Sequence, residues 1–484
     1  MEHAGCIDDF LDEPLLDQIG WNGKFYADGS GEVFTPPGLQ IPEVIFEKQS
    51  TRTHKNGDVR SWIVGVAEPL SGHSLAEFLM MIPFAGPMRS LSDRVENFGF
   101  ELIGRSSCGK SSLLQLMAST SGGIGGGSDG NYALSLAGTS AGFESVMRFY
   151  SDGAMLCDES TQFGLDLSPR QRGLAYTRLL MDLGRGQERQ RYLTTPRTHK
   201  MVIVITGNES YADIAGGTAA HVVLEAAAQR LITIPIGNRE FGVLDHLPTT
   251  HDDAGEFLNE RIAAAHRNHG TAMSAYIAGL VNERSDNESE LLGKIAHHKS
   301  TFLAQVNILP NDGQARRIAD AFASVYVAGL FAQHLDILPE SFDCLGSTLA
   351  TYDLHLSHNN PAIDALERIK VLATGEGVID LDRQQLPRLT SDELATAAGF
   401  TRTRRGGQRE FLIAPAKIRS IFPSWNRLRQ AEPLKSLITT EARHHEIKRP
   451  VRENRKRDRM VCIKMEDPSI DAKLTFIKRR GGSA

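Results

Sequence analysis

The sequence predicts an α/β protein whose parallel sheet is covered by helices on both faces. Four apolar segments between residues 98 and 236 have the length and composition of strands, and helical segments separate them: FGFELI, GAMLC, MVIVIT and RLITIPI. Apolar strands that show no alternation of buried and exposed residues are typical of a parallel sheet buried on both faces. The alternation of strands with helices indicates βαβ connections.

Three regions surround this core, which we place at residues 91–250. Short alternating runs such as RSWIVGVA, with the turn signals DGSG, TPPG and KNGD, predict a small β-rich N-terminal domain over residues 1–90. Helical periodicity over residues 251–380 predicts a helical lid with connecting helices. Residues 381–484 resemble a winged helix, because they read as a helix, a basic turn, a second helix and a final hairpin, followed by a basic tail.

Composition narrows the class of protein. The 484 residues are 41% apolar and 23% charged, as in an ordinary soluble globular protein. A net charge of -6 means that any nucleic-acid surface must be local. Five scattered cysteines without a C-x-x-C pair favour a reducing compartment. We therefore expect a cytoplasmic location and no membrane contact, since the N-terminus lacks the pattern of a signal peptide and the apolar stretch around Asp320 is too short to span a bilayer.

The segment GRSSCGKSS, which follows the first apolar strand, fits the P-loop pattern G-x-x-x-x-G-K-[ST]. Its glycines allow backbone N–H groups to surround phosphates, Lys110 adds a positive charge, and Ser111 offers an oxygen to Mg²⁺. An ordinary glycine turn is the alternative, but the strand before and the helix after favour the P-loop. The predicted nucleotide contacts in this segment are Gly104, Arg105, Ser106, Ser107, Cys108, Gly109, Lys110, Ser111 and Ser112.

Two polar segments follow later strands. GAMLC ends at Asp158 and Glu159, where Asp158 would hold Mg²⁺ through water and Glu159 would deprotonate the attacking water. MVIVIT ends near Asn208, where one class of P-loop ATPases places a residue that polarises this water. Taken alone, the acidic pair could be a solvated strand end, and Asn208 could be a turn residue. After a P-loop, the acidic pair favours hydrolysis over transfer to an acceptor.

With these elements in order, the sequence resembles the AAA+ ATPases. More closely, it resembles a bacterial family of mobile elements, long labelled a domain of unknown function, some of whose members look like minichromosome-maintenance helicases. The matching segments are GRSSCGKSS, GTSAGFESVMRFYSDGAMLCDE, LGRGQERQR, VIVITGNES, AQRLITIPI and RRIADAFASVYVAGLFA. The resemblance implies a P-loop core with a helical lid that works as a homo-oligomeric ring, usually a hexamer.

The resemblance also assigns residue roles. Arg230 stands where the family has an arginine finger that reaches the nucleotide of the neighbouring subunit. Arg317, or Arg316 beside it, stands where a lid helix has a nucleotide-sensing arginine. Solvated surface arginines are the alternative for all three. The sequence departs from the family at Gln187, where a hairpin lysine is usual, and at Ala321, where a second lid arginine is expected.

Basic clusters predict the nucleic-acid contacts. Helicase-type relatives insert a pore-facing hairpin where this chain has LGRGQERQRY, and the C-terminal region concentrates positive charge in an otherwise acidic protein. A solvated charged face, a protein-docking module or a disordered tail are the alternatives. The predicted DNA-binding residues are Arg185, Arg189, Arg191, Arg402, Arg404, Arg405, Arg409, Arg455, Lys456 and Arg457, in a tail that also contains Arg452 and Arg459.

Together these patterns predict an ATP-hydrolysing motor with Mg²⁺ as cofactor, and the family resemblance implies a DNA helicase or translocase that supports replication of a mobile element such as a prophage or plasmid. The predicted catalytic residues are Lys110, Asp158, Glu159, Asn208 and Arg230, with Ser111 and Asp158 at the metal. The expected partners are single-stranded or duplex DNA, further copies of the chain, and a primase or loader from the same element. The alternative is an ATP-switched DNA-binding regulatory or defence assembly that does not unwind DNA.

Overall fold

The computed structural model of the chain divides it into two compact units, Met1–His355 and Leu356–Ala484. The residues that the structure describes are 15–16, 19–39, 45–46, 50–91, 96–124, 130–136, 143, 146–186, 198–215, 230–237, 239–306, 308, 313–359, 361–382, 396–404, 407–422, 425–430, 434–440, 446–450 and 457–465.

The first unit is organised by a five-stranded parallel sheet with the strand order β10-β6-β9-β8-β7. Every residue of β6 and β9 is buried, which explains why these strands are apolar without alternation. The predicted α/β class and parallel core sheet are confirmed. The strands are β6 (Phe98–Ile103), β7 (Leu134–Ser135), β8 (Gly153–Asp158), β9 (Met201–Gly207) and β10 (Leu231–Pro235).

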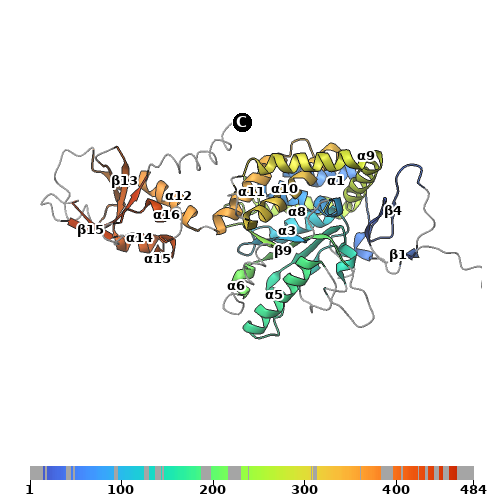
Figure 1. The fold of residues 1–484 in the computed structure, drawn as a ribbon, viewed down its shortest axis with the longest axis horizontal. Helices are drawn as coiled ribbons and strands as arrows, with labels where there is room; N and C mark the ends of the chain where they lie inside the picture. The colour runs from blue at the N-terminus through green and yellow to red at the C-terminus, as the bar shows by residue number, and fades with distance from the viewer. Residues whose placement is uncertain are drawn as a thin grey trace, which may run out of the picture. The chain divides into compact units, whose positions relative to one another are not determined.

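Helices cover both faces of this sheet (Figure 1). On one face, the ring of Phe100 packs against Phe78 and Phe322, which belong to α2 and α10. The next residue of the strand, Glu101, points to the opposite face and contacts the backbone of α6. The helices nearest to the sheet are α2 (Ser74–Ala85), α3 (Lys110–Ser119), α5 (Pro169–Arg185), α6 (Tyr211–Ala215) and α10 (Gly313–His334).

The N-terminal segment begins with short strands and continues as helix. Strands β2 (Gly20–Asn22), β3 (Phe25–Ala27) and β4 (Val33–Phe34) form an antiparallel sheet, and β1 (Leu15–Leu16) pairs in parallel with β5 (Ile45–Phe46). The small sheet is joined to the core because the Tyr26 hydroxyl donates to the backbone oxygen of Asp152 at 2.7 Å.

The prediction that RSWIVGVA belongs to a β-rich region is wrong. This segment forms α1 (Val59–Trp62) and a π-helical stretch (Ile63–Ala67). Its buried side chains are Trp62, Ile63, Val66 and Ala67, followed by Leu70. Positions i, i+1, i+4, i+5 and i+8 share one face of a helix, so the apparent two-residue alternation coincided with a helical repeat.

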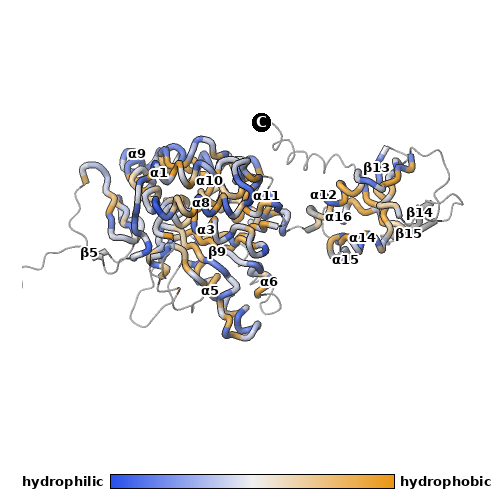
Figure 2. The backbone as a smooth tube through the Cα atoms, turned by 180° about the vertical axis from the view of Figure 1, so that it is seen from behind, coloured by the Kyte–Doolittle hydropathy of each residue, from blue (hydrophilic) through white to orange (hydrophobic). Residues whose placement is uncertain are grey.

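The predicted lid region is helical but is not confirmed as a separate lid. It contains α8 (Ala254–Arg267), α9 (Thr271–Leu303), α10, α11 (Cys344–Asn359) and α12 (Pro361–Thr374). Buried residues of α8 to α11 belong to the same hydrophobic core as the sheet, which extends from Tyr26 to Tyr352, whereas α12 contributes to the core of the second unit. The predicted boundaries at residues 90 and 250 both fall within the first of these cores. Figure 2 shows hydrophilic and hydrophobic residues alternating along α9.

The second unit has a five-stranded sheet with the order β11-β12-β13-β15-β14. The β11–β12 pair is parallel and the other pairs are antiparallel. Residues of the flanking helices share a core with Phe411, Ile413, Val461 and Ile463 of the sheet. The elements are α12 (Pro361–Thr374), β11 (Val378–Asp380), β12 (Gly399–Thr403), β13 (Arg409–Ile413), α14 (Pro415–Ile421), α15 (Trp425–Leu428), α16 (Leu434–Leu437), β14 (Glu446–Pro450) and β15 (Arg457–Lys464).

The predicted winged helix is not confirmed in this unit. The basic turn was expected between two helices, but it joins the two strands β12 and β13. The expected final hairpin, β14–β15, is present and extends the same sheet. The segment GFTRT forms β12 because Phe400 and Thr401 are buried against β13, a tertiary contact that local propensity does not encode. Among the described residues, no helix is both long and apolar enough to cross a membrane.

Candidate nucleotide-binding and hydrolysis site

The loop between β6 and α3 has the backbone that the P-loop pattern requires. Ser107 and Gly109 adopt left-handed conformations, with φ of 62° and 90°. A Cβ atom on Gly109 would lie 2.8 Å from Cγ2 of Val243, so both conformation and space require glycine there. Left-handed residues within such a loop turn successive N–H groups toward one point, where they can bind an anion.

Lys110 lies at the start of α3 with its side chain folded over this loop. Its ammonium group donates to the backbone oxygens of Gly104 at 2.7 Å and Arg105 at 2.8 Å. It also donates to Oδ1 of Asn208 at 3.2 Å. The residue is only 6% exposed. The P-loop lysine and the predicted water-orienting asparagine are therefore in direct contact.

The carboxyl ends of β8 and β9 bring three oxygens together beside the P-loop. Ser111 Oγ donates to Oδ1 of Asp158 at 3.0 Å. The hydroxyl of Thr206 donates to the same oxygen, and it accepts from the backbone N–H of Glu159 at 3.0 Å. Thr206 thus fixes both predicted acidic residues. It was missed in the sequence analysis, although a hydroxyl residue just before Asn208 in an otherwise apolar strand was a usable signal.

Glu159 follows β8 in a left-handed conformation, with φ of 59°. Its carboxylate accepts from the backbone N–H of Thr161 at 3.3 Å and from the Thr161 hydroxyl. The turn is tied to α5 by Arg172, which donates to the backbone oxygens of Phe163, Ser160 and Thr161. Arg172 is a second residue that sequence reasoning missed, because nothing local connects it to the acidic pair.

The strand order explains why these residues meet. Strand β9 lies between β6 and β8, so Asn208 follows the strand between the P-loop and the acidic pair. Parallel strands place all three carboxyl ends at one edge of the sheet, where ligands bind in open α/β sheets. The structure brings together Lys110, Ser111, Asp158, Glu159 and Asn208 as the sequence predicts.

The residues present fit a Mg²⁺-bound nucleoside triphosphate. Mg²⁺ prefers oxygen ligands, keeps several waters, and is usually held by one or two protein oxygens together with substrate phosphates. The adjacent Ser111 and Asp158 oxygens meet this requirement, and the P-loop backbone with Lys110 meets that of the phosphates.

We expect Thr206→Val to lower turnover about tenfold, because a hydrogen bond to a charged group contributes roughly 1.5–3 kcal/mol and here it orients Asp158. The KM for ATP should change less, since the P-loop contacts remain. Steady-state ATPase kinetics test this. Thr348→Val is the matched control: Thr348 is equally buried, but its hydroxyl donates to the backbone of Cys344 in α11. Equal losses in the two variants would contradict the assignment.

Arg230 lies at the other end of the sheet. Its backbone oxygen accepts from the N–H of Gly99 at the start of β6, and its guanidinium pairs with Glu96 at 2.7 Å. A Cβ on Gly184 would lie 2.3 Å from Cδ of Arg230, so the side chain passes directly over the end of α5. Within one chain Arg230 is therefore remote from Lys110, and any contact with a phosphate requires a second subunit.

The other predicted nucleotide and hairpin contacts are only partly described. Arg316 and Arg317 are exposed near the start of α10, and Arg185 is exposed at the last residue of α5. Arg189 and Arg191, like Gln187, lie outside the described residues, as do Arg405, Arg455 and Lys456 of the C-terminal unit. Arg457 begins β15.

Two of the predicted DNA-binding arginines in the second unit pair with a buried carboxylate. Glu410 is fully buried in β13, accepts a hydrogen bond from Arg402 at 2.9 Å and forms an ion pair with Arg404 at 3.3 Å. Arg409 lies 3.8 Å from Asp380 and is 48% exposed. Arg402 and Arg404 therefore have a structural role in this unit, whereas Arg409 offers more of its charge to solvent.

Replacing Glu410 with glutamine should destabilise the second unit by about 3 kcal/mol, the usual effect of breaking a buried ion pair. Urea unfolding followed by hydrogen exchange of the β13 amides measures this. Arg409→Gln is the control, because an exposed pair contributes less than about 1 kcal/mol. Similar stability of the two variants would show that Glu410 does not hold the unit together.

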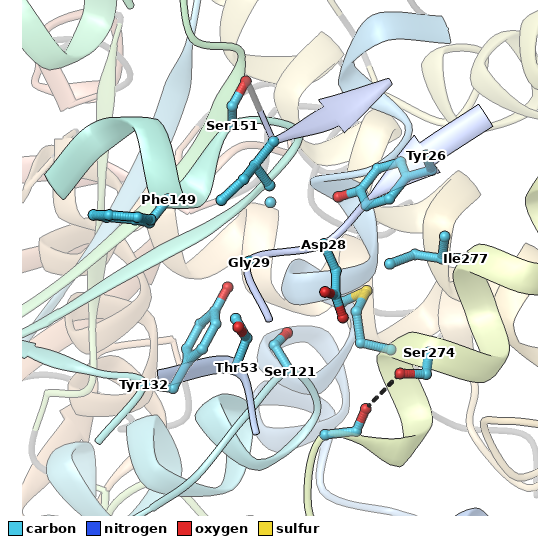
Figure 3. A pocket seen from close by; sticks show the side chains of 14 residues that line it. Tyr26, Asp28, Gly29, Thr53, Ser121, Tyr132, Phe149, Ser151, Ser274 and Ile277 are labelled. Atoms are coloured by element: carbon cyan, nitrogen blue, oxygen red, sulfur yellow. Dashed lines mark hydrogen bonds between the residues drawn. The ribbon is translucent and has the colours of Figure 1, made fainter. Parts of the chain in front are cut away.

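A cavity of about 40 Å³ lies near the amino end of β8, between the N-terminal strands and α9. Figure 3 shows Asp28, Thr53, Tyr132 and Ser274 around it. This volume holds a water molecule but not a nucleotide. It is lined by residues from the opposite end of the sheet to the P-loop, so it is separate from the candidate site.

The family model of a domain of unknown function, DUF927, matches residues 12–197. A search of curated proteins finds no match. Among solved structures, the chain is similar to one described as SCCmec type IV Cch, an active helicase, with a TM-score of 0.54 and 15% sequence identity. The match covers 95% of this chain and 80% of that one, so the chain shares the fold of this helicase over nearly its whole length.

Proposed function

We propose that this protein is an ATP-hydrolysing AAA+ motor that acts on DNA, as a helicase or translocase of a mobile element. The observation that carries the proposal is the contact network of Lys110, Ser111, Asp158 and Asn208 at one sheet edge. In this sheet, β9 lies between β6, which leads to the P-loop, and β8, which ends at Asp158. The similarity to an active helicase of a mobile element supports the choice of DNA as the partner.

In this proposal each residue has one task. The P-loop N–H groups and Lys110 bind the β- and γ-phosphates. Ser111 and Asp158 would hold Mg²⁺, which would supply positive charge against the charge that develops on the phosphates. Asn208 orients a water molecule, and Glu159 accepts its proton as the oxygen attacks the γ-phosphorus and ADP leaves. Arg230 of a neighbouring subunit would stabilise the transferring group, which makes a ring, most simply a hexamer, part of the proposal.

The test combines ATPase and strand-displacement assays on the full chain, with and without DNA. The wild type should hydrolyse ATP faster with DNA and separate a forked duplex, while Lys110→Ala should lose both activities. DNA-stimulated hydrolysis without displacement would favour a translocase or the ATP-switched regulatory assembly. Absence of any hydrolysis that depends on Lys110 would reject the proposal.

A further inference from the structure

A carboxyl group is buried in the central strand that leads to the P-loop. Glu101 is 4% exposed, and its neighbours Phe100 and Leu102 are fully buried. Of the residues that the structure describes, no lysine, arginine or histidine forms an ion pair with it. An unpaired buried carboxyl group destabilises a fold unless hydrogen bonds compensate, so its contacts identify what it does.

These contacts connect three elements. Oε2 of Glu101 accepts from the backbone N–H of Tyr211, the first residue of α6, at 2.9 Å. Oε1 accepts from the hydroxyl of Thr233 in β10. Glu101 therefore holds the start of α6 against β6, on the face of the sheet opposite to α2 and α10.

A hydrogen-bonded turn connects Asn208 to the start of α6. Asp213 accepts from the backbone N–H of Ser210 at 3.1 Å and from its hydroxyl at 2.7 Å, which fixes the turn between Asn208 and Tyr211. Asn208 in turn accepts from Lys110, and Lys110 donates to the backbone oxygen of Gly104. These contacts therefore link Glu101 in β6, through the start of α6, Asn208 and Lys110, to Gly104 directly after the same strand.

We infer that Glu101 is a positioning residue for hydrolysis, which acts through α6 to hold Asn208 in place beside Lys110. This inference rests on the proposed ATPase function. Glu101 itself touches no predicted phosphate contact, so its loss should impair the orientation of water more than the binding of nucleotide.

The ionisation of Glu101 gives a second way to observe this role. Burial raises the pKa of Glu101 to about 7, and the nearby Asp213 carboxylate acts in the same direction, against the hydrogen bonds from Thr233 and Tyr211. The other groups that face it are the phenol of Tyr176 on α5 and that of Tyr211; His355 of α11 contacts the backbone oxygen of Thr233. Because a carboxylate accepts a hydrogen bond more strongly than a neutral group, its hold on Tyr211 should tighten as pH rises through about 7.

The first experiment separates binding from turnover. Glu101→Leu keeps a side chain of similar size but leaves the Tyr211 N–H without its acceptor, and kcat should fall about tenfold. The KM for ATP should stay within about twofold, since the P-loop is unchanged. Thr233→Val is the control, because it removes the other contact of Glu101 and leaves Tyr211 bound. Unchanged kcat in Glu101→Leu, or an equal loss in Thr233→Val, would overturn the inference.

The second experiment uses Glu101→Gln, which retains an acceptor for Tyr211 but cannot ionise. The ratio of wild-type kcat to Glu101→Gln kcat should be near one at pH 6 and rise to about threefold at pH 8. A flat ratio would overturn the inference even if Glu101→Leu fails to fold. Both results require a wild type whose hydrolysis depends on Lys110, and its absence would reject the proposed function instead.

Discussion

Glu159→Gln should bind ATP as the wild type does and lose at least about a hundredfold in turnover, because general-base catalysis contributes about 10²–10⁴-fold. Glutamine has nearly the same shape, so its oxygen can still accept from Thr161, as the carboxylate does in the structure. The backbone N–H of residue 159 also keeps its bond to the Thr206 hydroxyl. The site would therefore retain its geometry and lose only the group that accepts the proton of water.

Nucleotide binding by a fluorescent ATP analogue and single-turnover hydrolysis together test this prediction. Glu209→Gln is the matched control, because Glu209 is an exposed carboxylate next to Asn208 at the same sheet edge. We expect Glu209→Gln to retain turnover. If the control loses hydrolysis and Glu159→Gln keeps it, the base is Glu209 and the assignment is reversed.

Sequence patterns predicted the core sheet because its strands are buried on both faces. Every residue of β6 and β9 is buried, so each strand is a nearly continuous apolar run in the sequence. Such a run can be recognised as a buried strand without knowing which residues it contacts. The N-terminal helix was mistaken for a strand because Trp62, Val64 and Val66 follow a two-residue period over a short window. In the structure Trp62 and Val66 are buried, but Val64 is exposed. Strand β12 was missed because its neighbour β13 comes after the basic turn, and pairing decides strand formation there.

In the candidate site too, some residues could be predicted from the sequence and others could not. Residues in contiguous motifs, such as Lys110 and Asp158, could be identified from spacing alone. Thr206 contacts residues 47 and 48 positions away, and Arg172 binds backbone oxygens, so no local pattern encodes either role. Arg402 pairs with Glu410 across β12 and β13. Counting basic residues in the sequence therefore predicted a DNA contact for a guanidinium that forms an ion pair within the fold.

Arg230→Ala should lower ATP turnover by about a thousandfold if Arg230 completes the site of a neighbouring subunit, the usual scale for an arginine finger. The register of β10 with β6 places Arg230 beside Phe98, six residues before Gly104. At about 3.3 Å per residue this is about 20 Å along the strand, beyond the reach of an arginine side chain. Its own P-loop is thus excluded as its target, and the prediction depends on a second copy of the chain.

Mixing two inactive variants distinguishes this role from a structural one. Arg230→Ala subunits keep Glu159, and Glu159→Gln subunits keep Arg230, so mixed rings should contain some complete sites and recover part of the activity. Glu96→Gln is the control, because it removes the partner that holds Arg230 within its own chain at 2.7 Å but leaves the guanidinium available. If Arg230 serves only that ion pair, Glu96→Gln should be as impaired as Arg230→Ala, and mixing should restore nothing.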